Sequence, residues 1–448
     1  MSTLVKLGQK GKKIVKKFIT PSEKHYLSHT RRLEQIKTDR RVCAMTFDDG
    51  PMDMPASPDR FGGRALTDVL LDTLAEFGAK GTFDVIGDTS ENYPDKAGKV
   101  GSAAWGGIKF DHYPDLGCDG KGGAAHNDRL IRRILDEGHQ ITNHGYRHII
   151  FGKKPFVYGA REYLGSVDRA VDDLRRLDVL MEERYGYKLT MARPPHYVDK
   201  MQDGFTSYDA YDKMGYQYMA ASFDGAGWLP STLSDPEAAL EAEVNAMVEP
   251  MRKELEKDPD FFCGQIIFQK DGCNMLRRTP IADGLGKQLE CLSRLGYKVV
   301  PVSELMALSP FLDLPQSDPR AAAAKKLLDA GWCPAFRDNT LRADTALTRG
   351  ALAMMAFGWQ GVDTRIALVK GTERSPWADL KPTHPYAGAL VQAERAGCLA
   401  AENGSIRPDA PVTAAEASRF LSVKLGRAPA KLPGTLTHGA LFLAAGEL

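Results

Sequence analysis

The stretch RVCAMTFDDGP, residues 41–51, joins a strand-like run to two adjacent acids and a turn. Its first seven residues are mostly apolar or β-branched, which is typical of a buried strand. Gly50 and Pro51 end the run, so Asp48 and Asp49 stand where the strand gives way to a loop. The stretch therefore predicts a strand that carries reactive side chains at its carboxyl end.

Six further strand-like runs follow, separated by segments of helical period. Repeated β-then-α order predicts parallel strands joined by crossover helices. Seven such strands favour closure into a barrel, with the working residues in the loops after the strands. We therefore expect an α/β fold. The six runs are 81–87, 139–143, 189–194, 218–224, 264–269 and 297–302.

Composition divides the 448 residues into three parts. Residues 1–40 are a basic amphipathic segment, 41–308 the α/β domain, and 318–448 short Ala-rich and Leu-rich helices without strand signal. Lys and Arg total 59 against 58 Asp and Glu, which argues against a nucleic-acid partner. Seven scattered cysteines without a CxxC pair predict reduced thiols.

The N-terminal segment has lysines on one face and apolar residues at roughly helical spacing on the other. This pattern is compatible with peripheral contact to an anionic membrane. We favour a solvated basic leader, because charge runs usually mark solvated faces. No export signal is recognisable, which predicts a cytoplasmic protein.

Two residue pairs have the pattern of a catalytic metal site. On an extended backbone neighbouring side chains point in opposite directions, so one of Asp48 and Asp49 can bind a metal while the other acts as a base. His144 and His148 have HxxxH spacing, which on a helical turn places both imidazoles on one face. Two imidazoles and one carboxylate leave coordination positions open for water and substrate.

Five motifs, in this order, resemble those of the polysaccharide deacetylase family, which has the NodB-homology domain. The resemblance spans residues 41–308. It implies a distorted (β/α)7 barrel and metal-dependent hydrolysis of N-acetyl groups, less often O-acetyl groups, on a sugar polymer. The motifs are TFDDGP (46–51), GTFDVIG (81–87), GHQITNHGYRH (138–148), ARPPHY (192–197) and LGYKVVPVSEL (295–305).

The resemblance also implies roles for the paired residues. Asp48 resembles the catalytic base that takes a proton from the attacking water. Asp49, His144 and His148 resemble the ligands of a divalent ion, with zinc expected first and cobalt as an alternative. The implied substrate is an acetylated glycan.

Five more residues receive roles from the same resemblance. Arg193 resembles the arginine that orients the base, and the backbone N–H near His196 resembles the oxyanion donor. Tyr197, Asp224 and Trp228 are expected on the substrate side, with Trp228 as an aromatic wall of the groove. As alternatives, Asp224 could cap a strand end or pair with Arg193, and Trp228 could be core.

Position 270 departs from the family pattern. The family supplies a proton-donating histidine from a motif resembling LLHDG, and the stretch IIFQKDGC places Lys270 there. Gly227 stands where the family has the aspartate that orients this histidine. Because a lysine ordinarily titrates near about pH 10.4, three interpretations stay open. Lys270 acts as an acid or oxyanion stabiliser, His196 donates the proton, or the site binds metal and glycan with slow turnover.

Three sequence echoes follow residue 318, at 341–356, 406–422 and 435–445, each with a polar turn, a Thr and an apolar helix face. They resemble S-layer homology repeats, a family that binds cell-wall glycans, although the second copy lacks the family's arginine and the third is truncated. The alternative is a helical packing or dimerisation module. The fitting residues are Trp377, Asp379, Tyr386, Pro408 and Thr413.

Two functions from different classes account for these patterns. The first is a metal-dependent amidohydrolase acting on acetylated sugars. The second is a glycan-binding scaffold in which Lys270 marks lost chemistry. The two resemblances point to the cell envelope, in conflict with the missing export signal.

Overall fold

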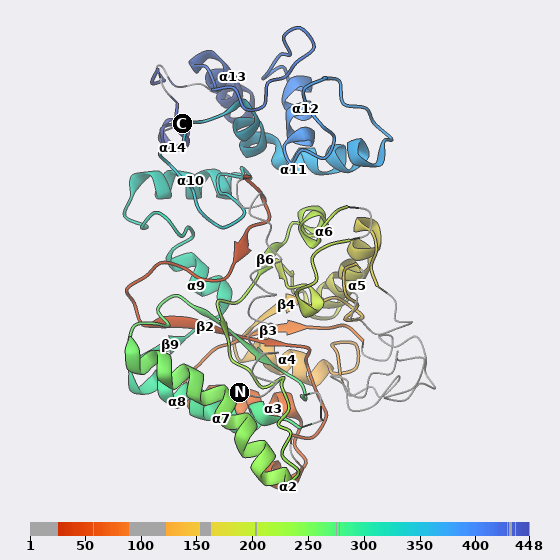
Figure 1. Ribbon diagram of the computed structural model, residues 1–448, viewed down its shortest axis with the longest axis vertical. Helices are drawn as coiled ribbons and strands as arrows, with labels where there is room; N and C mark the ends of the chain where they lie inside the picture. Colours follow the sequence, from red (N-terminus) through yellow and green to blue (C-terminus); the bar gives the residue numbers. More distant parts are fainter. Residues whose placement is uncertain are drawn as a thin grey trace. The chain divides into compact units, whose positions relative to one another are not determined.

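The computed structural model describes residues 26–447, except 57, 89–121, 153–162, 202–203, 275, 277, 428, 430–431 and 435. Residues 1–25 of the predicted basic amphipathic segment lie outside the described residues. The chain forms two compact units, Leu33–Leu308 and Met1–Arg32 with Ser309–Leu448 (Figure 1). None of the described helices is both long and apolar enough to cross a membrane.

The larger unit is an α/β half-barrel of parallel strands (Figure 1). The sheet has the order β1-β6-β5-β4-β3-β2-β8-β7, and β9 pairs with β2 off this path. The pairs from β2 to β6, and those of β8 and β9, are parallel, which confirms the predicted fold class. The strands are β1 (Arg32–Leu33), β2 (Val42–Asp48), β3 (Thr82–Val85), β4 (Gln140–Asn143), β5 (Met191–Ala192), β6 (Gln217–Met219), β7 (Phe223–Asp224), β8 (Ile266–Lys270) and β9 (Lys298–Val299).

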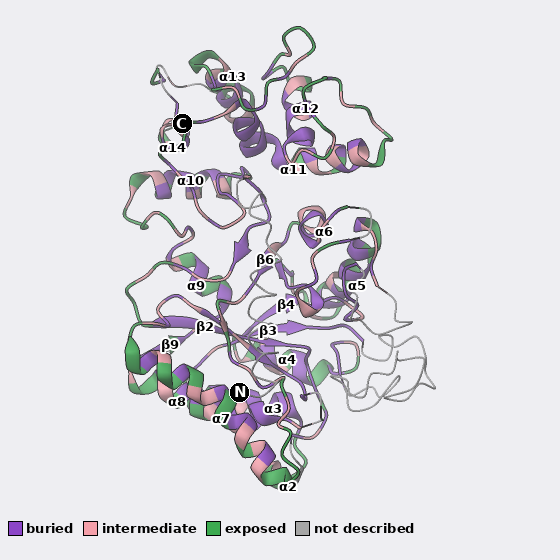
Figure 2. Cartoon of the chain, viewed as in Figure 1, coloured by how far each residue is buried: buried purple, intermediate pink, exposed green. Residues whose placement is uncertain are grey.

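Helices connect most of these strands. Helices α7 and α8 pack against each other, and their outer faces are exposed while the central strands are buried (Figure 2). Local signals define their starts: the Asp235 side chain accepts a hydrogen bond from the Ala238 N–H, and proline occupies the first turn. The helices are α2 (Pro58–Phe61), α3 (Leu66–Glu76), α4 (Asp128–Asp136), α5 (Val167–Tyr185), α6 (Ser207–Met214), α7 (Pro236–Lys257), α8 (Pro280–Arg294) and α9 (Val302–Leu308).

One predicted strand is in fact two. The run 218–224 contains the end of β6 and all of β7, which stand at different places in the sheet order. Between them the Ala220 N–H donates to the Leu33 carbonyl and the Ser222 N–H to the Ile266 carbonyl. Within residues 220–222 the backbone therefore changes its hydrogen-bonding partner from the segment of Leu33 to strand β8. This short segment connects β6 and β7, which stand toward opposite ends of the sheet order.

His139 is a buried histidine at the start of β4. Its Nδ1 accepts a hydrogen bond from the Gly81 N–H at 2.9 Å, and its ring meets Phe83 edge-on at 5.5 Å. Burial, helped by the Lys80 ammonium, lowers the pKa of His139 to about 4. In the unfolded chain a histidine titrates near about pH 6.5.

Acid should therefore destabilise the larger unit through His139. Between about pH 6.5 and 4 the unfolded state binds this proton more readily, so stability present above pH 6.5 is lost as the pH falls. At about 1.4 kcal/mol per pH unit, lowering the pH to 5 should cost about 2 kcal/mol. Between pH 7.5 and 5, the free energy of unfolding of His139→Asn should fall by about 2 kcal/mol less than that of the wild type, as measured by urea unfolding. Equal losses in both proteins would contradict this.

The smaller unit contains helices around its own apolar core, which includes Trp332, Leu352 and Phe420. Helix α11 packs on α12, and α10 packs on α14. Residues 26–32 belong to this unit, where the Leu27 N–H donates to the Tyr386 hydroxyl at 2.8 Å. The helices are α10 (Pro319–Asp329), α11 (Arg349–Lys370), α12 (Ala387–Arg395), α13 (Ala414–Leu425) and α14 (His438–Gly446).

The smaller unit has an internal repeat. Asp313 accepts a hydrogen bond from the Arg342 N–H at 2.7 Å, and Asp379 accepts one from the Arg407 N–H at the same distance. Both arginines have left-handed backbones, with φ of 46° and 52°. The same turn therefore recurs at the start of the first two of the three sequence echoes. The repeat helices α11, α13 and α14 each begin at an N-cap threonine, Thr348, Thr413 and Thr437.

Candidate metal centre

Strand β2 places Asp48 in a row of charged side chains. The parallel register pairs Asp48 with Asp84 of β3 on one side and with Lys270 of β8 on the other. Residues paired in this way project toward the same face of a sheet. All three are buried, with Asp84 fully so. The carboxyl ends of three strands thus hold three ionisable groups together out of water.

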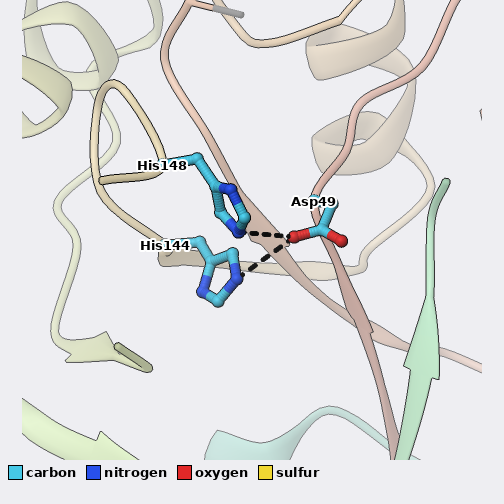
Figure 3. A group of neighbouring side chains, drawn as sticks. All are labelled: Asp49, His144 and His148. Atoms are coloured by element: carbon cyan, nitrogen blue, oxygen red, sulfur yellow. Dashed lines mark ion pairs between the residues drawn. The ribbon is translucent and has the colours of Figure 1, made fainter. Parts of the chain in front are cut away.

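Asp49 leaves the line of the strand because its backbone is left-handed, with φ of 81°. Its Oδ1 lies 2.9 Å from Nε2 of His148 and 3.3 Å from Nε2 of His144 (Figure 3). The expectation that strand alternation separates Asp48 from Asp49 is wrong, since Asp49 lies beyond the strand. The left-handed backbone at Asp49, just after the strand, is what directs the side chains of Asp48 and Asp49 apart.

His144 and His148 lie in a tight loop after β4, so the predicted helical turn is wrong. The Asn143 side chain accepts the N–H two residues further on at 2.9 Å. Asp173 of α5 accepts the Tyr146 N–H at 2.9 Å. These bonds curl the loop, and the two imidazole rings lie 5.0 Å apart. Both Nε2 atoms consequently face Asp49 (Figure 3).

The far side of the His144 ring faces two acceptors. Its Nδ1 lies 2.9 Å from the Arg193 carbonyl oxygen and 2.7 Å from Oδ2 of Asp84. Acceptors at Nδ1 favour the tautomer that carries its proton there, which leaves Nε2 free to bind a cation. Burial lowers the pKa of His144, but the Asp84 and Asp48 carboxylates together raise it above its ordinary value.

Asp49, His144 and His148 form a candidate site for a divalent metal. One ligand atom from each lies within 4.8 Å of the others, and all three residues are buried. Two imidazole nitrogens and one carboxylate oxygen are the donor set of catalytic zinc sites. The hydrogen-bonded Nδ1 of His144 is also the support that metal-binding histidines require. The donors therefore fit a resident divalent ion.

Arg193 forms a buried ion pair with Asp48. The guanidinium has no exposed area, and its Nη1 donates to Oδ1 of Asp48 and to the Thr46 hydroxyl, the latter at 3.0 Å. Its Nε and Nη2 donate to the carbonyls of Met219 and Ala220, each at 3.2 Å. Burial raises the pKa of Asp48, and the Arg193 charge partly opposes this rise.

Lys270 contacts a ligand of the candidate site. Its ammonium pairs with Oδ2 of Asp49, the oxygen that does not face the histidines. Burial lowers the pKa of Lys270 to about 8. The next residue, Asp271, accepts a hydrogen bond from the Thr67 hydroxyl, and burial raises its pKa to about 7. Lys270 therefore lies against one ligand of the candidate metal centre.

His196 and Tyr197 occupy a short 3-10 turn after β5, and both have left-handed backbones. The His196 ring lies 5.4 Å from the His148 ring. Arg193 stacks over the Tyr197 ring at 5.5 Å, and the Tyr197 N–H donates to the Pro194 carbonyl. The structure thus brings the predicted loop next to the metal centre.

Asp224 and Trp228 lie on another strand end. The Trp228 indole N–H donates to the Asp224 carboxylate at 3.2 Å. Strand β7, which ends at Asp224, is separated from β2 by β8. Asp224 is exposed and Trp228 is half-buried, so neither is core.

Asp84 was missed by the sequence reasoning. It lies inside a motif taken for a plain buried strand, and Thr142 donates to its other oxygen. The available signal was an acid in an otherwise apolar four-residue run, because a buried charge needs a partner. No spacing rule connects it with His144, which lies sixty positions later in the sequence.

Part of the chain that contains this site matches a known protein family. Residues 35–219, less than half of the chain, match the family described as Polysaccharide deacetylase. The match contains Asp48, Asp49, His144, His148 and Arg193, but not Lys270 or the helical unit. It therefore gives no support to the resemblance of residues 318–448 to S-layer homology repeats.

Three individual proteins show similarity to the chain. Peptidoglycan-N-acetylmuramic acid deacetylase PdaC of Bacillus subtilis is 22% identical over 39% of this chain and a quarter (25%) of its own length. A Bacillus cereus peptidoglycan-N-acetylglucosamine deacetylase is 22% identical over 61% of this chain and 91% of its own length. The structure of a CE4 family pseudoenzyme from Bacillus anthracis is 14% identical, with a TM-score of 0.38, over 61% of this chain and 68% of that one.

Proposed function

Given that residues 35–219 match the polysaccharide deacetylase family, we propose that the chain is a metal-dependent hydrolase that removes N-acetyl groups from a glycan. The observation that carries the proposal is the convergence of Asp49, His144 and His148 beside Asp48. The similar proteins of Bacillus subtilis and Bacillus cereus described above are named as peptidoglycan deacetylases. Peptidoglycan, or a glycoconjugate with the same N-acetyl sugars, is therefore the proposed substrate, and an O-acetylated glycan is the less favoured one.

Zinc is the proposed ion, with cobalt as the alternative, because imidazole and carboxylate donors suit both. Asp49, His144 and His148 would hold the ion, which would supply polarisation of an acetyl carbonyl and a lowered pKa of water. The chain's own part is to hold three donors at a fixed separation. The loops around His144 and Asp49 do this through backbone hydrogen bonds and a left-handed turn.

Asp48 is the proposed general base. Its Oδ2 lies 3.9 Å from Nε2 of His144, so the carboxylate stands beside the ligand group. Arg193 holds the other oxygen and thereby fixes the orientation of the carboxylate. A carboxylate placed here can take a proton from the attacking water. The backbone N–H near His196 is the proposed donor to the oxyanion.

Two residues compete to protonate the leaving amine. The motif resemblance puts Lys270 where the family's histidine is expected, but its ammonium is paired with Asp49. His196 lies beside His148 in the loop after β5. The ion pair favours His196 as the acid, with Lys270 as a fixed cation, because a lysine that gives up its proton would leave Asp49 without this partner.

A glycan-binding scaffold is the second candidate function. The contact between Lys270 and Asp49 favours it, since a buried ammonium already offsets charge that a metal would otherwise neutralise. The cell-wall contact of residues 318–448 and the membrane contact of the basic N-terminal segment, residues 1–40, are inferred from sequence alone. They remain predictions.

Acetate release and glycan binding, measured together, distinguish the two functions. The substrates are N-acetylated peptidoglycan fragments, O-acetylated glycans, and peptidoglycan fragments already stripped of N-acetyl groups as the control. The hydrolase should release acetate from the first in molar excess over protein, with zinc present. Saturable binding of the same fragments without any acetate would overturn the hydrolase and support the scaffold.

A further inference from the structure

Two charged residues next to the candidate metal centre are neither the proposed base nor proposed metal ligands. Lys270 and Asp84 flank Asp48 in the row that runs across β8, β2 and β3. Both are buried, at 3% and 0% exposure. Each touches a different ligand, Lys270 the Asp49 carboxylate and Asp84 the His144 ring.

Lys270 opposes metal binding in two ways. Its ammonium occupies Oδ2 of Asp49, so that only Oδ1 of this carboxylate faces the two histidines. It is also a cation buried beside the place that a divalent cation would take. Repulsion between like charges is strong where water is excluded, because the local dielectric is low.

Asp84 acts in the opposite direction. Its Oδ2 lies 2.7 Å from Nδ1 of His144, and its other oxygen accepts a hydrogen bond from the Thr142 hydroxyl. A carboxylate behind a metal-binding histidine fixes the ring and makes its other nitrogen a better donor. The Asp84 charge also offsets that of Lys270, two positions away across the same row.

A count of formal charges shows that Lys270 and Asp84 change the net charge of the site by equal and opposite amounts. Among the side chains that pair with one another or with His144, three carboxylates (Asp48, Asp49 and Asp84) face two cations (Arg193 and Lys270), which leaves one net negative charge. The buried carboxyl of Asp271, next to Lys270, is outside this count. A divalent ion changes this to one net positive charge. Without Asp84 the same ion would leave two net positive charges, and without Lys270 it would leave none.

We propose that Lys270 and Asp84 are positioning residues that set the metal affinity in opposite directions, Lys270 weakening it and Asp84 strengthening it. The proposal rests on the proposed function only in taking Asp49, His144 and His148 as the ligands.

Calorimetry with Zn²⁺ on the purified full chain, in competition with a chelator, tests the proposal without any acetate assay. Lys270→Met should lower the Kd by roughly 10-fold to 100-fold, and Asp84→Asn should raise it by a similar factor. The double variant should return toward the wild-type value. Lys257→Met and Asp136→Asn, at exposed positions of α7 and α4, are matched controls that should leave the Kd unchanged.

Each outcome separates this inference from the proposed function. If the wild type binds Zn²⁺ and Lys270→Met binds it no more tightly, the inference fails while the metal centre stands. If only Lys270→Met binds, the inference is supported in its strongest form. If neither binds, the metal centre itself is wrong. Lys270→Gln replaces Lys270→Met if circular dichroism shows that the methionine variant does not fold, and Co²⁺ absorption spectra show whether the same ligands are used.

Discussion

Acetate release by the Asp48→Asn variant should fall by about 100-fold to 10,000-fold, the usual contribution of a positioned general base. An asparagine keeps the size of the side chain and can still accept a hydrogen bond from Arg193, but it cannot take a proton from water. The measurement is the turnover rate for N-acetylated peptidoglycan fragments at saturating zinc. Asp136→Asn, an exposed substitution on α4, is the matched control.

The role of Asp48 as base also requires that the metal stays bound. Zinc affinity, measured by calorimetry, should fall by less than turnover. The loss of the Asp48 charge weakens the attraction for a cation, but Asp48 stands beside the Asp49 group rather than within it. A fall in zinc affinity as large as the fall in turnover would make Asp48 a ligand. Undiminished turnover would remove it from the mechanism.

Replacing Arg193 by Met should destabilise the larger unit by about 3–5 kcal/mol, the typical cost of breaking a buried ion pair by removing one partner. The guanidinium has no exposed area, and its loss leaves the Asp48 carboxylate buried without its partner. The carbonyls of Met219 and Ala220 lose their donors as well. Urea unfolding at neutral pH, with the wild type as reference, measures this loss.

A second variant separates the charge from the packing in this prediction. In Arg193→Met with Asp48→Asn no carboxylate is left unpaired, so the double variant should recover part of the lost stability. Equal stability of the single and double variants would show that the stranded charge is not the main cost. In that case the lost backbone hydrogen bonds and packing would account for the effect.

The strands and their order of appearance follow from local sequence, because buried parallel strands read as short apolar runs between helical segments. Strand β2 is predicted almost to the residue by the run 41–47. The division of 218–224 into β6 and β7 is not predictable in this way. It depends on Leu33 and Ile266, which offer carbonyls from distant parts of the chain.

Motifs predict the residues of the candidate metal centre, but not their geometry. Asp49 and His148 reach their positions through left-handed backbones, with φ of 81° and 52°, rather than through strand alternation or a helical turn. These conformations are stabilised by contacts such as that of Asp173 on the histidine loop. Such contacts come from other elements, so no periodicity of the local sequence reports them.

For Lys270 and Asp84, the two residues proposed to set metal affinity, the local sequence also does not reveal the contacts. Lys270 was singled out because a motif position carried an unexpected residue, yet its contact with Asp49 became visible only in the structure. Asp84 was passed over because its neighbours in β3 look like ordinary core. Strand register, which brings both beside Asp48, is a tertiary property.

Acetate release by the wild-type chain before metal removal, after chelation and after zinc is restored is the most direct test of the metal-dependent hydrolase. N-acetylated peptidoglycan fragments are the substrate, and bound metal is quantified in each sample. The account predicts release that is lost with the metal and regained with zinc. Undiminished release from the fully chelated protein, or no release from protein with zinc bound, would contradict it.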